Sequence, residues 1–289
     1  MIGIGHEGIE REDVAREWSA ARKIRVLSRG AGADVLEVEE GGRASVVKVL
    51  RRGASLVERA RFAREIDALA SVRHANVVRI DKVVTDAEGV RAIVMPRLVG
   101  SSLRTWLATF GRMPAPFVLT VFSDVLDGLS ELHGRGVVHR DLKPSNLFIG
   151  REDHERPSDA RGIVLDLGLA STASGAVTTG SHLVGSVRYM SPEQLLAGGI
   201  DARCDVWGTG VCLFEALTGG PAFPTDDPLE ILRHDPVERL VAPTSPDRRG
   251  WSAIARVLAR ALAKRPRDRF ASAAAMREAL LEARGEVAR

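Results

Sequence analysis

A short polar run lies among apolar residues at positions 138–148, which read VHRDLKPSNLF. It places His139, Arg140, Asp141 and Lys143 almost in succession, so that groups able to carry charge or exchange protons are crowded together. Such groups are costly to hold beside a hydrophobic segment unless they are paired or used in chemistry. An exposed turn is the simpler alternative, because the Pro-Ser-Asn that follows is typical of turns. The run alone does not decide between the two.

Other charged residues lie in or beside predicted regular structure. Lys48 is flanked by valines near the end of a predicted strand, where an exposed edge position is the alternative. Glu65 lies in a predicted helix, where Arg61 and Arg64 could pair with it equally well. Asp166 ends an apolar strand immediately before Leu-Gly, a frequent position for a metal ligand or a catalytic acid. Each signal is weak alone, so their order along the chain carries the interpretation.

The elements that must position these residues divide the chain into two parts. Residues 22–100 are strand-rich, with a hairpin turn predicted at Gly41-Gly42 and a helix in LVERARFAREIDALASV. Two more strands are expected on either side of Glu88-Gly89. From about residue 115 helices dominate, predicted at 115–134, 203–218, 252–263 and 272–284, with short strands at VVH, NLFI and GIVLDLG. We therefore expect an N-terminal extension at 1–21 that forms a short helix, one domain part at 22–96 and another at 97–289.

Composition narrows the class of protein. The chain has 289 residues, 45% of them hydrophobic and 27% charged, which is ordinary for a soluble globular protein. Its net charge of +3, without a Lys/Arg block, does not favour nucleic-acid binding. Cys204 and Cys212 fit buried free thiols in a reducing compartment. The acidic N-terminus is unlike a signal peptide, and no apolar run approaches the roughly 18 residues needed to span a bilayer. We expect a cytoplasmic protein without membrane or nucleic-acid partners.

The charged residues follow one another in the order and spacing of a known signature. They resemble the motifs of the protein kinase family, matched here by Lys48, Glu65, His139-Arg140-Asp141, Lys143, Asn146 and Asp166-Leu167-Gly168. Three later stretches are similar to the end of the activation segment, the central helix and the late arginine of the large lobe: GSVRYMSPE (185–193), CDVWGTGV (204–211) and KRPRDRF (264–270). The resemblance covers residues 22–284. The form DLKPSN is typical of serine/threonine kinases, and the whole looks most like the bacterial eukaryotic-like members.

This resemblance implies an α+β, two-lobed protein-kinase-like fold. It has a small β-rich N-lobe with one major helix and a larger, mainly helical C-lobe. The implied activity is transfer of the ATP γ-phosphate to Ser or Thr hydroxyls of protein substrates. The implied cofactors are ATP and Mg²⁺, with Mn²⁺ as an alternative ion.

The resemblance also implies the roles of individual side chains. Lys48 would hold the α- and β-phosphates and be oriented by an ion pair with Glu65. Asp166 would bind Mg²⁺ and Asn146 the second metal site. Phosphoryl transfer requires mainly positioning and charge neutralisation, which explains the residue types.

In the polar run itself, Asp141 would orient the attacking hydroxyl and accept its proton, a role worth about 10²–10⁴-fold in rate. Lys143 would neutralise the γ-phosphate during transfer. His139 would be structural and pack against Leu167. The polar run is then a catalytic loop.

Other family positions form the adenine pocket and the scaffold. Met95 falls at the gatekeeper position, and the hinge comprises Pro96, Arg97 and Leu98. Val35 and Val47 are expected to cover the adenine ring from above and Phe148 from below. The scaffold residues are Asp205, expected to hold the catalytic-loop backbone, and the pair of Glu193 with Arg269.

The chain departs from the family in its glycine-rich loop. The family pattern GxGxxG falls on SRGAGA (28–33), where only Gly30 matches; Ser28 and Ala33 replace the other two glycines. This departure supports an alternative function, a pseudokinase scaffold that acts through protein contacts. A small-molecule phosphotransferase is disfavoured, because YMSPE shapes a peptide-docking groove in the family.

Regulation and partners are further expectations. The segment after Asp166 is rich in Ser and Thr, and we predict autophosphorylation at Thr178 or Thr179, with Ser181 also mid-loop. The phosphate would dock on Arg140, while Ser186 would serve catalysis as a free hydroxyl. We expect a monomer or weak dimer and an input signal from a separate regulatory or sensor protein. Because Ser145 replaces the Glu that often accompanies basic-substrate selection, no strong preference for upstream Arg or Lys is expected.

Overall fold

The computed structural model describes residues 21–30, 32–85, 91–150, 160–167, 187–239 and 250–287. Backbone contacts group the chain into two compact parts. We call them the N-terminal unit (residues up to 66, and 79–97) and the C-terminal unit (67–78, and 98 onward). The sequence suggested one cut after residue 96, whereas the contacts also assign residues 67–78 to the C-terminal unit. The helix expected within 1–21 lies outside the described residues, except that Ala21 begins strand β1.

The N-terminal unit is built on a five-stranded antiparallel sheet with the order β1-β2-β3-β5-β4. The strands are β1 Ala21–Arg29, β2 Ala33–Glu40, β3 Arg43–Leu50, β4 Lys82–Thr85 and β5 Arg91–Pro96. The hairpin predicted at Gly41-Gly42 is confirmed. Both glycines have positive φ, 58° and 79°, a conformation that the short turns between twisted strands require.

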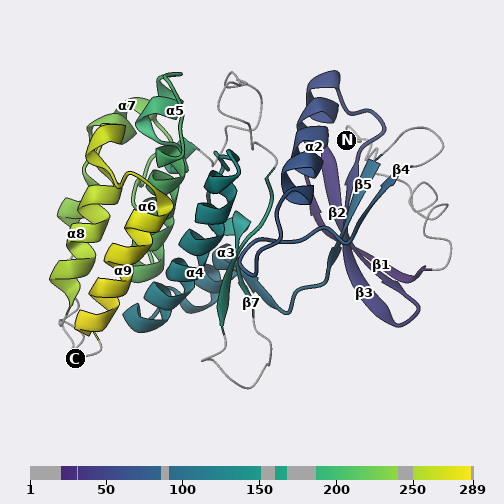
Figure 1. Ribbon diagram of the computed structural model, residues 1–289, viewed down its shortest axis with the longest axis horizontal. Coiled ribbons are helices and arrows are strands. Elements are labelled where there is room, and N and C mark those ends of the chain that lie inside the picture. The colour runs from purple at the N-terminus through teal and green to yellow at the C-terminus, as the bar shows by residue number, and fades with distance from the viewer. Residues whose placement is uncertain are drawn as a thin grey trace, which may run out of the picture. The chain divides into compact units, whose positions relative to one another are not determined.

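Helix α2 (Leu56–Ala70) packs on one face of this sheet (Figure 1). Its Phe62 and Ile66 form a cluster with the sheet residues Leu50 and Ile93. The opposite face carries a second cluster of small aliphatic side chains: Leu36, Val38, Val47, Ala92 and Val94. Because successive residues of a strand point to opposite faces, these two clusters show on which of the two faces each side chain of β2, β3 and β5 lies.

The C-terminal unit is mainly helical. Its helices are α3 Leu103–Phe110, α4 Ala115–Gly134, α5 Pro192–Leu195, α6 Arg203–Thr218, α7 Pro228–Arg233, α8 Trp251–Ala261 and α9 Ala273–Val287. Helices α4, α8 and α9 pack together (Figure 1). A small antiparallel sheet with the order β6-β7-β8 lies in the same unit, formed by Gly100–Ser102, Leu147–Gly150 and Arg161–Val164. None of the helices that the structure describes is long and apolar enough to cross a bilayer.

Helices α4 and α6 each contribute more buried apolar residues to this unit than any other of its described helices. Helix α4 follows Pro114, and α6 ends at Gly219, whose φ of 76° suits a helix C-cap. A proline at the start of α4 and a glycine at the end of α6 explain why these bounds could be predicted from the sequence. Helix α6 is buried on all sides from Cys204 to Leu217 and is therefore the central helix of the unit. Strand β8 lies close to α4 because Gly162 has no side chain; a Cβ there would overlap the Val121 carbonyl oxygen.

The strand predicted at VVH (137–139) is wrong. In the described chain Val138 makes only a single bridge, and no strand forms there. The physical reason is that the backbone N–H groups of His139 and Arg140 donate to the Asp205 side chain. A backbone donor used in this way cannot take part in a strand ladder.

Candidate active site

The centre of the candidate site is the carboxylate of Asp205, in the first turn of α6. It accepts hydrogen bonds from the backbone N–H groups of His139 and Arg140, each at 2.8 Å. It also lies 2.8 Å from Nε2 of His133, at the end of α4. The side chain is 1% exposed. A buried carboxylate with three donors around it fixes the backbone of the polar run.

The electrostatics of Asp205 agree with this role. Burial alone raises the pKa of the carboxyl, because it disfavours the charged form. The hydrogen bond and charge of His133, with the backbone donors, act in the opposite direction and bring its pKa below the usual 3.8. Asp205 is therefore ionised in the folded protein.

Two residues of the site adopt a left-handed backbone conformation. Arg140 has φ 65° and Asp166 has φ 51°. This conformation is uncommon outside glycine, and such residues cluster at functional sites where neighbouring contacts hold them in place. For Arg140 the contacts lie on both sides of the residue: Asp205 accepts from its N–H, and Gln194 Nε2 donates to its carbonyl oxygen at 2.8 Å.

Asp141 is held by two side chains of its own loop. Lys143 Nζ donates to Asp141 Oδ2 at 2.7 Å. Asn146 Nδ2 donates to the backbone oxygen of Asp141 at 2.8 Å and to Oδ2 at 3.1 Å. The carboxylate remains partly exposed, with 20% of the side chain accessible. The loop therefore presents an oriented carboxylate next to a lysine cation.

His139 is fully buried and bonded through both ring nitrogens. Nε2 lies 2.9 Å from the Leu165 carbonyl oxygen, which can only accept. Nδ1 lies 3.2 Å from the backbone N–H of Asp141, which can only donate. The imidazole is therefore neutral with its proton on Nε2, and it braces the loop instead of exchanging protons. This agrees with a structural role, and Leu165 supplies the hydrogen-bond partner.

Asn146 and Asp166 offer oxygen ligands of the kind that Mg²⁺ prefers. The amide nitrogen of Asn146 is occupied by Asp141, so its Oδ1, to which Ser145 Oγ donates at 3.4 Å, is the atom that can bind a cation. The Leu165 N–H donates to the Asn146 carbonyl oxygen at 2.8 Å and so ties the two segments together. Among the described residues no group of three or more His, Cys, Asp or Glu is placed to hold a metal ion. One carboxylate and one amide suit an ion that keeps water or phosphate ligands, so the donor set fits Mg²⁺.

The N-terminal unit holds the second candidate group. Lys48 Nζ, on β3, donates to both carboxylate oxygens of Glu65, on α2, at 2.7 and 2.8 Å. The Lys48 side chain is 14% exposed and that of Glu65 is 3% exposed. Arg64, which the sequence left as a possible partner, turns to the Ala60 carbonyl oxygen. The structure thus favours the Lys48–Glu65 pair over the exposed alternatives.

The divergent glycine-rich loop is a tight turn between β1 and β2. The Gly30 N–H donates to the Ala33 carbonyl oxygen at 2.9 Å, and a Cβ at Gly30 would lie 2.7 Å from that oxygen. The one family glycine that the sequence keeps is therefore the one with no room for a side chain. The Arg51 N–H also donates to the Gly32 carbonyl oxygen at 2.9 Å, which ties the turn to the end of β3. Ser28 lies on the exposed end of β1.

The sheet register corrects one part of the expected adenine pocket. Val35 pairs with Lys48, and Leu36 pairs with Val47, so Val35 and Lys48 share one face while Val47 points to the other. Val47 is 0% exposed within the cluster on that other face. Val35 and Val47 therefore cannot cover the same face of a ligand. Val46, which precedes Val47, lies on the face of Val35 and Lys48 and is the residue that the sequence reasoning missed.

The remaining predicted pocket residues are partly buried. Met95 and Pro96 end β5 in the N-terminal unit, and Met95 packs on the cluster below α2. Leu98 and Phe148 belong to the C-terminal unit, Phe148 on β7. Their roles towards a nucleotide stay predictions.

The predicted scaffold pair is formed by side chains far apart in sequence. Arg269 Nη1 and Nη2 donate to the two Glu193 oxygens, each at 2.7 Å. The remaining Arg269 donors reach backbone carbonyl oxygens of Arg203, Ala263 and Lys264. A buried guanidinium with all of these partners is a satisfied structural group.

Of the stretch expected to end the activation segment, residues 187–193 are described, and they begin with the short turn Val187–Tyr189. The Tyr189 hydroxyl donates to Glu215 Oε2, on α6, at 3.1 Å. Burial raises the pKa of Glu215 to about 7. The predicted phosphorylation sites Thr178, Thr179 and Ser181, and also Ser186, lie outside the described residues.

Three contributors to the site were missed from the sequence: His133, Gln194 and Glu215. Only Gln194 had a local signal. SPEQ is a helix capping box, in which Gln194 Oε1 accepts from the Ser191 N–H at 3.1 Å. His133 and Glu215 lie within long helical patterns, where nothing local separates a site residue from a core residue.

Comparisons with known proteins agree with this geometry. Residues 21–281 match the family described as protein kinase domain. The chain is 37% identical to the serine/threonine-protein kinase Pkn1 of Myxococcus xanthus, over 96% of this chain and 40% of that protein. It is 36% identical to PksC of Streptomyces coelicolor over 77% of this chain and 41% of that one. It is 33% identical to PknB of Mycobacterium leprae over 76% of this chain and 35% of that protein.

The chain thus spans less than half the length of these curated relatives, each of which is named a serine/threonine-protein kinase. The family match covers both the strand-rich and the helical unit. Together with the loop geometry, it shows that this chain belongs to the protein kinase family, within the group that resembles the bacterial eukaryotic-like serine/threonine kinases.

Proposed function

We propose that this chain transfers the γ-phosphate of ATP to serine and threonine hydroxyls of proteins. The observation that carries the proposal is the loop of Asp141. Its carboxylate is oriented by Lys143 and Asn146, on a backbone that Asp205 holds from α6. An oriented carboxylate beside a lysine can receive a hydroxyl proton and stabilise charge on a transferring phosphoryl group.

The proposed roles follow the family pattern. Asp141 orients the acceptor hydroxyl and takes its proton, and Lys143 neutralises charge on the transferring group. Lys48, aligned by Glu65, binds the α- and β-phosphates of the nucleotide. Asn146 and Asp166 hold the metal ion, for which Mg²⁺ is favoured and Mn²⁺ is the alternative. When bound, the ion supplies positive charge to the phosphate oxygens. We propose that the chain acts in the cytoplasm, where ATP is supplied.

A pseudokinase scaffold is the second candidate function. Its support is the pair of replacements at Ser28 and Ala33 in the glycine-rich loop. Gly30, where a side chain would not fit, is kept, and the charged catalytic positions are all present. The named relatives are kinases as well. These observations favour the enzyme.

Autophosphorylation of the activation segment is part of the proposal. A phosphate adds about −1.5 to −2 charges and three acceptor oxygens, which match a guanidinium well. Arg140 precedes Asp141, so a phosphate docked on it would act next to the catalytic carboxylate. We expect the modification at Thr178 or Thr179. Intact-mass and phosphopeptide analysis should find it in the wild type and not in Asp141→Asn.

One experiment separates enzyme from scaffold. The purified chain is incubated with Mg·ATP and a general protein substrate, beside the Asp141→Asn variant. Transfer by the wild type and not by the variant supports the enzyme. Nucleotide binding without transfer by either protein supports the scaffold. Equal transfer by both would show that Asp141 does not have the proposed role.

A further inference from the structure

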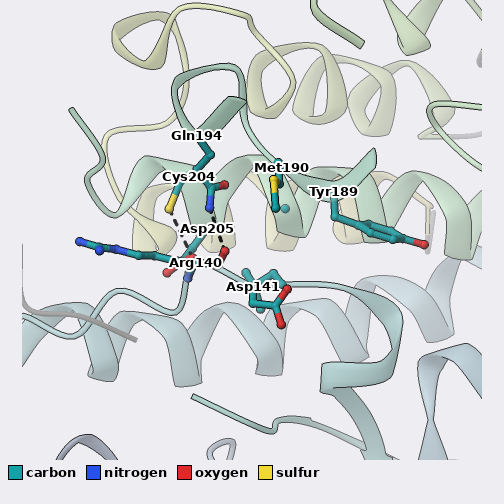
Figure 2. A pocket seen from close by; sticks show the side chains of 9 residues that line it. Arg140, Asp141, Tyr189, Met190, Gln194, Cys204 and Asp205 are labelled. Carbon is teal, nitrogen blue, oxygen red and sulfur yellow. Dashed lines mark hydrogen bonds between the residues drawn. The ribbon is translucent and has the colours of Figure 1, made fainter. Parts of the chain in front are cut away.

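A partly exposed arginine, Arg188, is the chain neighbour of a residue that lines a cavity with Asp141. Tyr189 and Met190 line the same small cavity as Arg140 and Asp141 (Figure 2). Arg188 directly precedes Tyr189 in the turn Val187–Tyr189. Any peptide that brings a hydroxyl to Asp141 extends by about 3.3–3.6 Å per residue. Four residues on either side of that hydroxyl span about 13 Å, which is long enough to reach Arg188 as the chain neighbour of the cavity residue Tyr189.

The guanidinium of Arg188 is held in a fixed orientation by Asp226. Arg188 Nε lies 3.1 Å from Asp226 Oδ1, and Nη2 lies 3.0 Å from Oδ2. The two side chains are 29% and 46% exposed, so solvent and a peptide can reach both. This two-point pair uses one edge of the guanidinium, and a second carboxylate can still bind through Nη1.

The other anchor of this turn offers no charge to a peptide. Glu215 accepts from the Tyr189 hydroxyl, and only 6% of the residue is exposed. A cationic residue of a substrate would have to displace that contact to reach it. The cation of Arg188 is therefore the accessible charge of this turn, and Asp226 is the group that competes for it.

We propose that Arg188 is a specificity-determining residue that selects acidic residues close to the phosphorylated Ser or Thr, and that Asp226 restrains this selection. The inference rests on the proposed kinase function and names its substrate class. Exposed ion pairs are individually weak. The preference for acidic peptides is therefore a few-fold in kcat/KM, and it increases when the carboxylate of Asp226 is removed.

The test is a positional peptide library in which Asp, Glu, Arg, Lys or a neutral residue occupies each of the four positions on either side of a central Ser. Wild type, Arg188→Gln, Arg188→Glu and Asp226→Asn are compared, with Arg188→Lys as the charge-conserving control. We expect wild type to favour an acidic residue by about 2- to 5-fold at one or more positions. Arg188→Gln loses this preference, Arg188→Glu reverses it towards Arg or Lys, Asp226→Asn increases it and Arg188→Lys retains part of it.

The inference is overturned if the variants lower kcat/KM equally for all peptides, because the pair would then only anchor the turn. Acid selection that survives Arg188→Gln would also overturn it. A neutral reference peptide distinguishes a failure of this inference from a failure of the proposed kinase function. Wild type that phosphorylates the reference without selecting acids contradicts only the inference, whereas wild type that phosphorylates no peptide or protein contradicts the kinase activity as well. Thermal unfolding of each variant shows whether the fold is kept.

Discussion

Two buried carboxylates, Asp205 in the C-terminal unit and Glu65 in the N-terminal unit, are 1% and 3% exposed. Their surroundings differ. Asp205 accepts from two backbone N–H groups and faces a histidine from a neighbouring helix. Both oxygens of Glu65 accept from one ammonium group at the end of a flexible side chain, Lys48. Burial alone would have given the two acids the same role.

The partners assign different roles. Backbone donors cannot move without refolding the loop, so Asp205 fixes the conformation of residues 139–140. A lysine stem is mobile, so Glu65 restricts where one cation can lie. The first carboxylate therefore contributes mainly to stability, and the second mainly to the placement of charge. Mutations should separate the two contributions.

The largest effect is expected from Asp205→Ala. It leaves two buried backbone donors and His133 without their acceptor, and at about 1–3 kcal/mol for each unpaired buried donor the loss is at least about 3 kcal/mol. The free energy of unfolding, measured in urea, should fall by that amount, and phosphate transfer should fall with it. Glu278→Ala, which removes an exposed carboxylate on α9, is the control and should change stability by less than about 0.5 kcal/mol. Similar stabilities for the two variants would contradict the framework role.

Lys48→Met should reduce phosphate transfer strongly and stability only moderately. Transfer should fall by at least about 10²-fold, the size of effect that a charge acting in the transition state supplies. Unfolding should stay cooperative, with a stability loss of about 1–3 kcal/mol from the buried acceptor left on Glu65. Lys82→Met, which changes an exposed lysine of the same sheet, is the matched control and should keep both properties. Retained transfer in Lys48→Met would exclude Lys48 from phosphate binding.

The bounds of the helices that support the site were predicted from the sequence more accurately than the contacts of its side chains. Helices α4 and α6 have the predicted bounds, because both are long and rich in apolar residues, α4 begins after Pro114 and α6 ends before Gly219. The short elements β6, α3, α5 and α7 were missed, because a few residues carry too little periodicity. Periodicity therefore predicted the helices that support the loop of Asp141 but not the short elements around it.

Two predictions failed for identifiable reasons. In one, a side chain takes the backbone donors that a strand would need; in the other, the alternation of side chains between the two faces of a strand was overlooked. The strand predicted at VVH has an apolar pattern, but Asp205 takes the backbone donors that a ladder would use. Val47 was placed beside Val35, although a shift of one residue in a strand turns a side chain to the other face. Arg188–Asp226 left no sequence signal, since an ion pair between distant segments depends on tertiary structure alone.

Glu215 allows a smaller test, through pH. Burial raises its pKa in the folded protein from the usual 4.5 to about 7, so the folded state holds a proton that the unfolded state has released. The stability that this proton supplies is complete below about pH 4.5 and is lost as the pH rises through about 7. The difference in pKa corresponds to at most about 3 kcal/mol. Protein interiors screen charges more strongly than a dry medium does, so we expect about 1–2 kcal/mol.

The measurement is the free energy of unfolding of wild type and Glu215→Gln between pH 5 and pH 8. Gln cannot ionise, and its Oε1 can still accept from Tyr189. The variant should gain about 1–2 kcal/mol relative to wild type on going from pH 5 to pH 8. Glu230→Gln, at an exposed position on α7, should follow the wild-type curve. Parallel curves for wild type and Glu215→Gln would show that Glu215 ionises normally in the folded protein.

The smallest effect is expected in the glycine-rich loop of the N-terminal unit. Its turn is closed by the Gly30–Ala33 backbone bond and tied to β3 by the bond from Arg51 to Gly32. Neither bond requires glycine at Ser28 or Ala33, so these replacements leave the turn intact. The double change Ser28→Gly with Ala33→Gly should therefore keep the KM for ATP or lower it by no more than about 3-fold, which is under 1 kcal/mol.

Gly30→Ala provides the contrast at the same loop. Its Cβ would meet the Ala33 carbonyl oxygen at 2.7 Å, so the turn must open and the KM for ATP should rise. If the double change to glycine raises the KM, Ser28 or Ala33 contacts the nucleotide directly. If Gly30→Ala leaves the KM unchanged, this turn does not cover the phosphates. Binding would then depend on the Lys48–Glu65 pair without help from the loop.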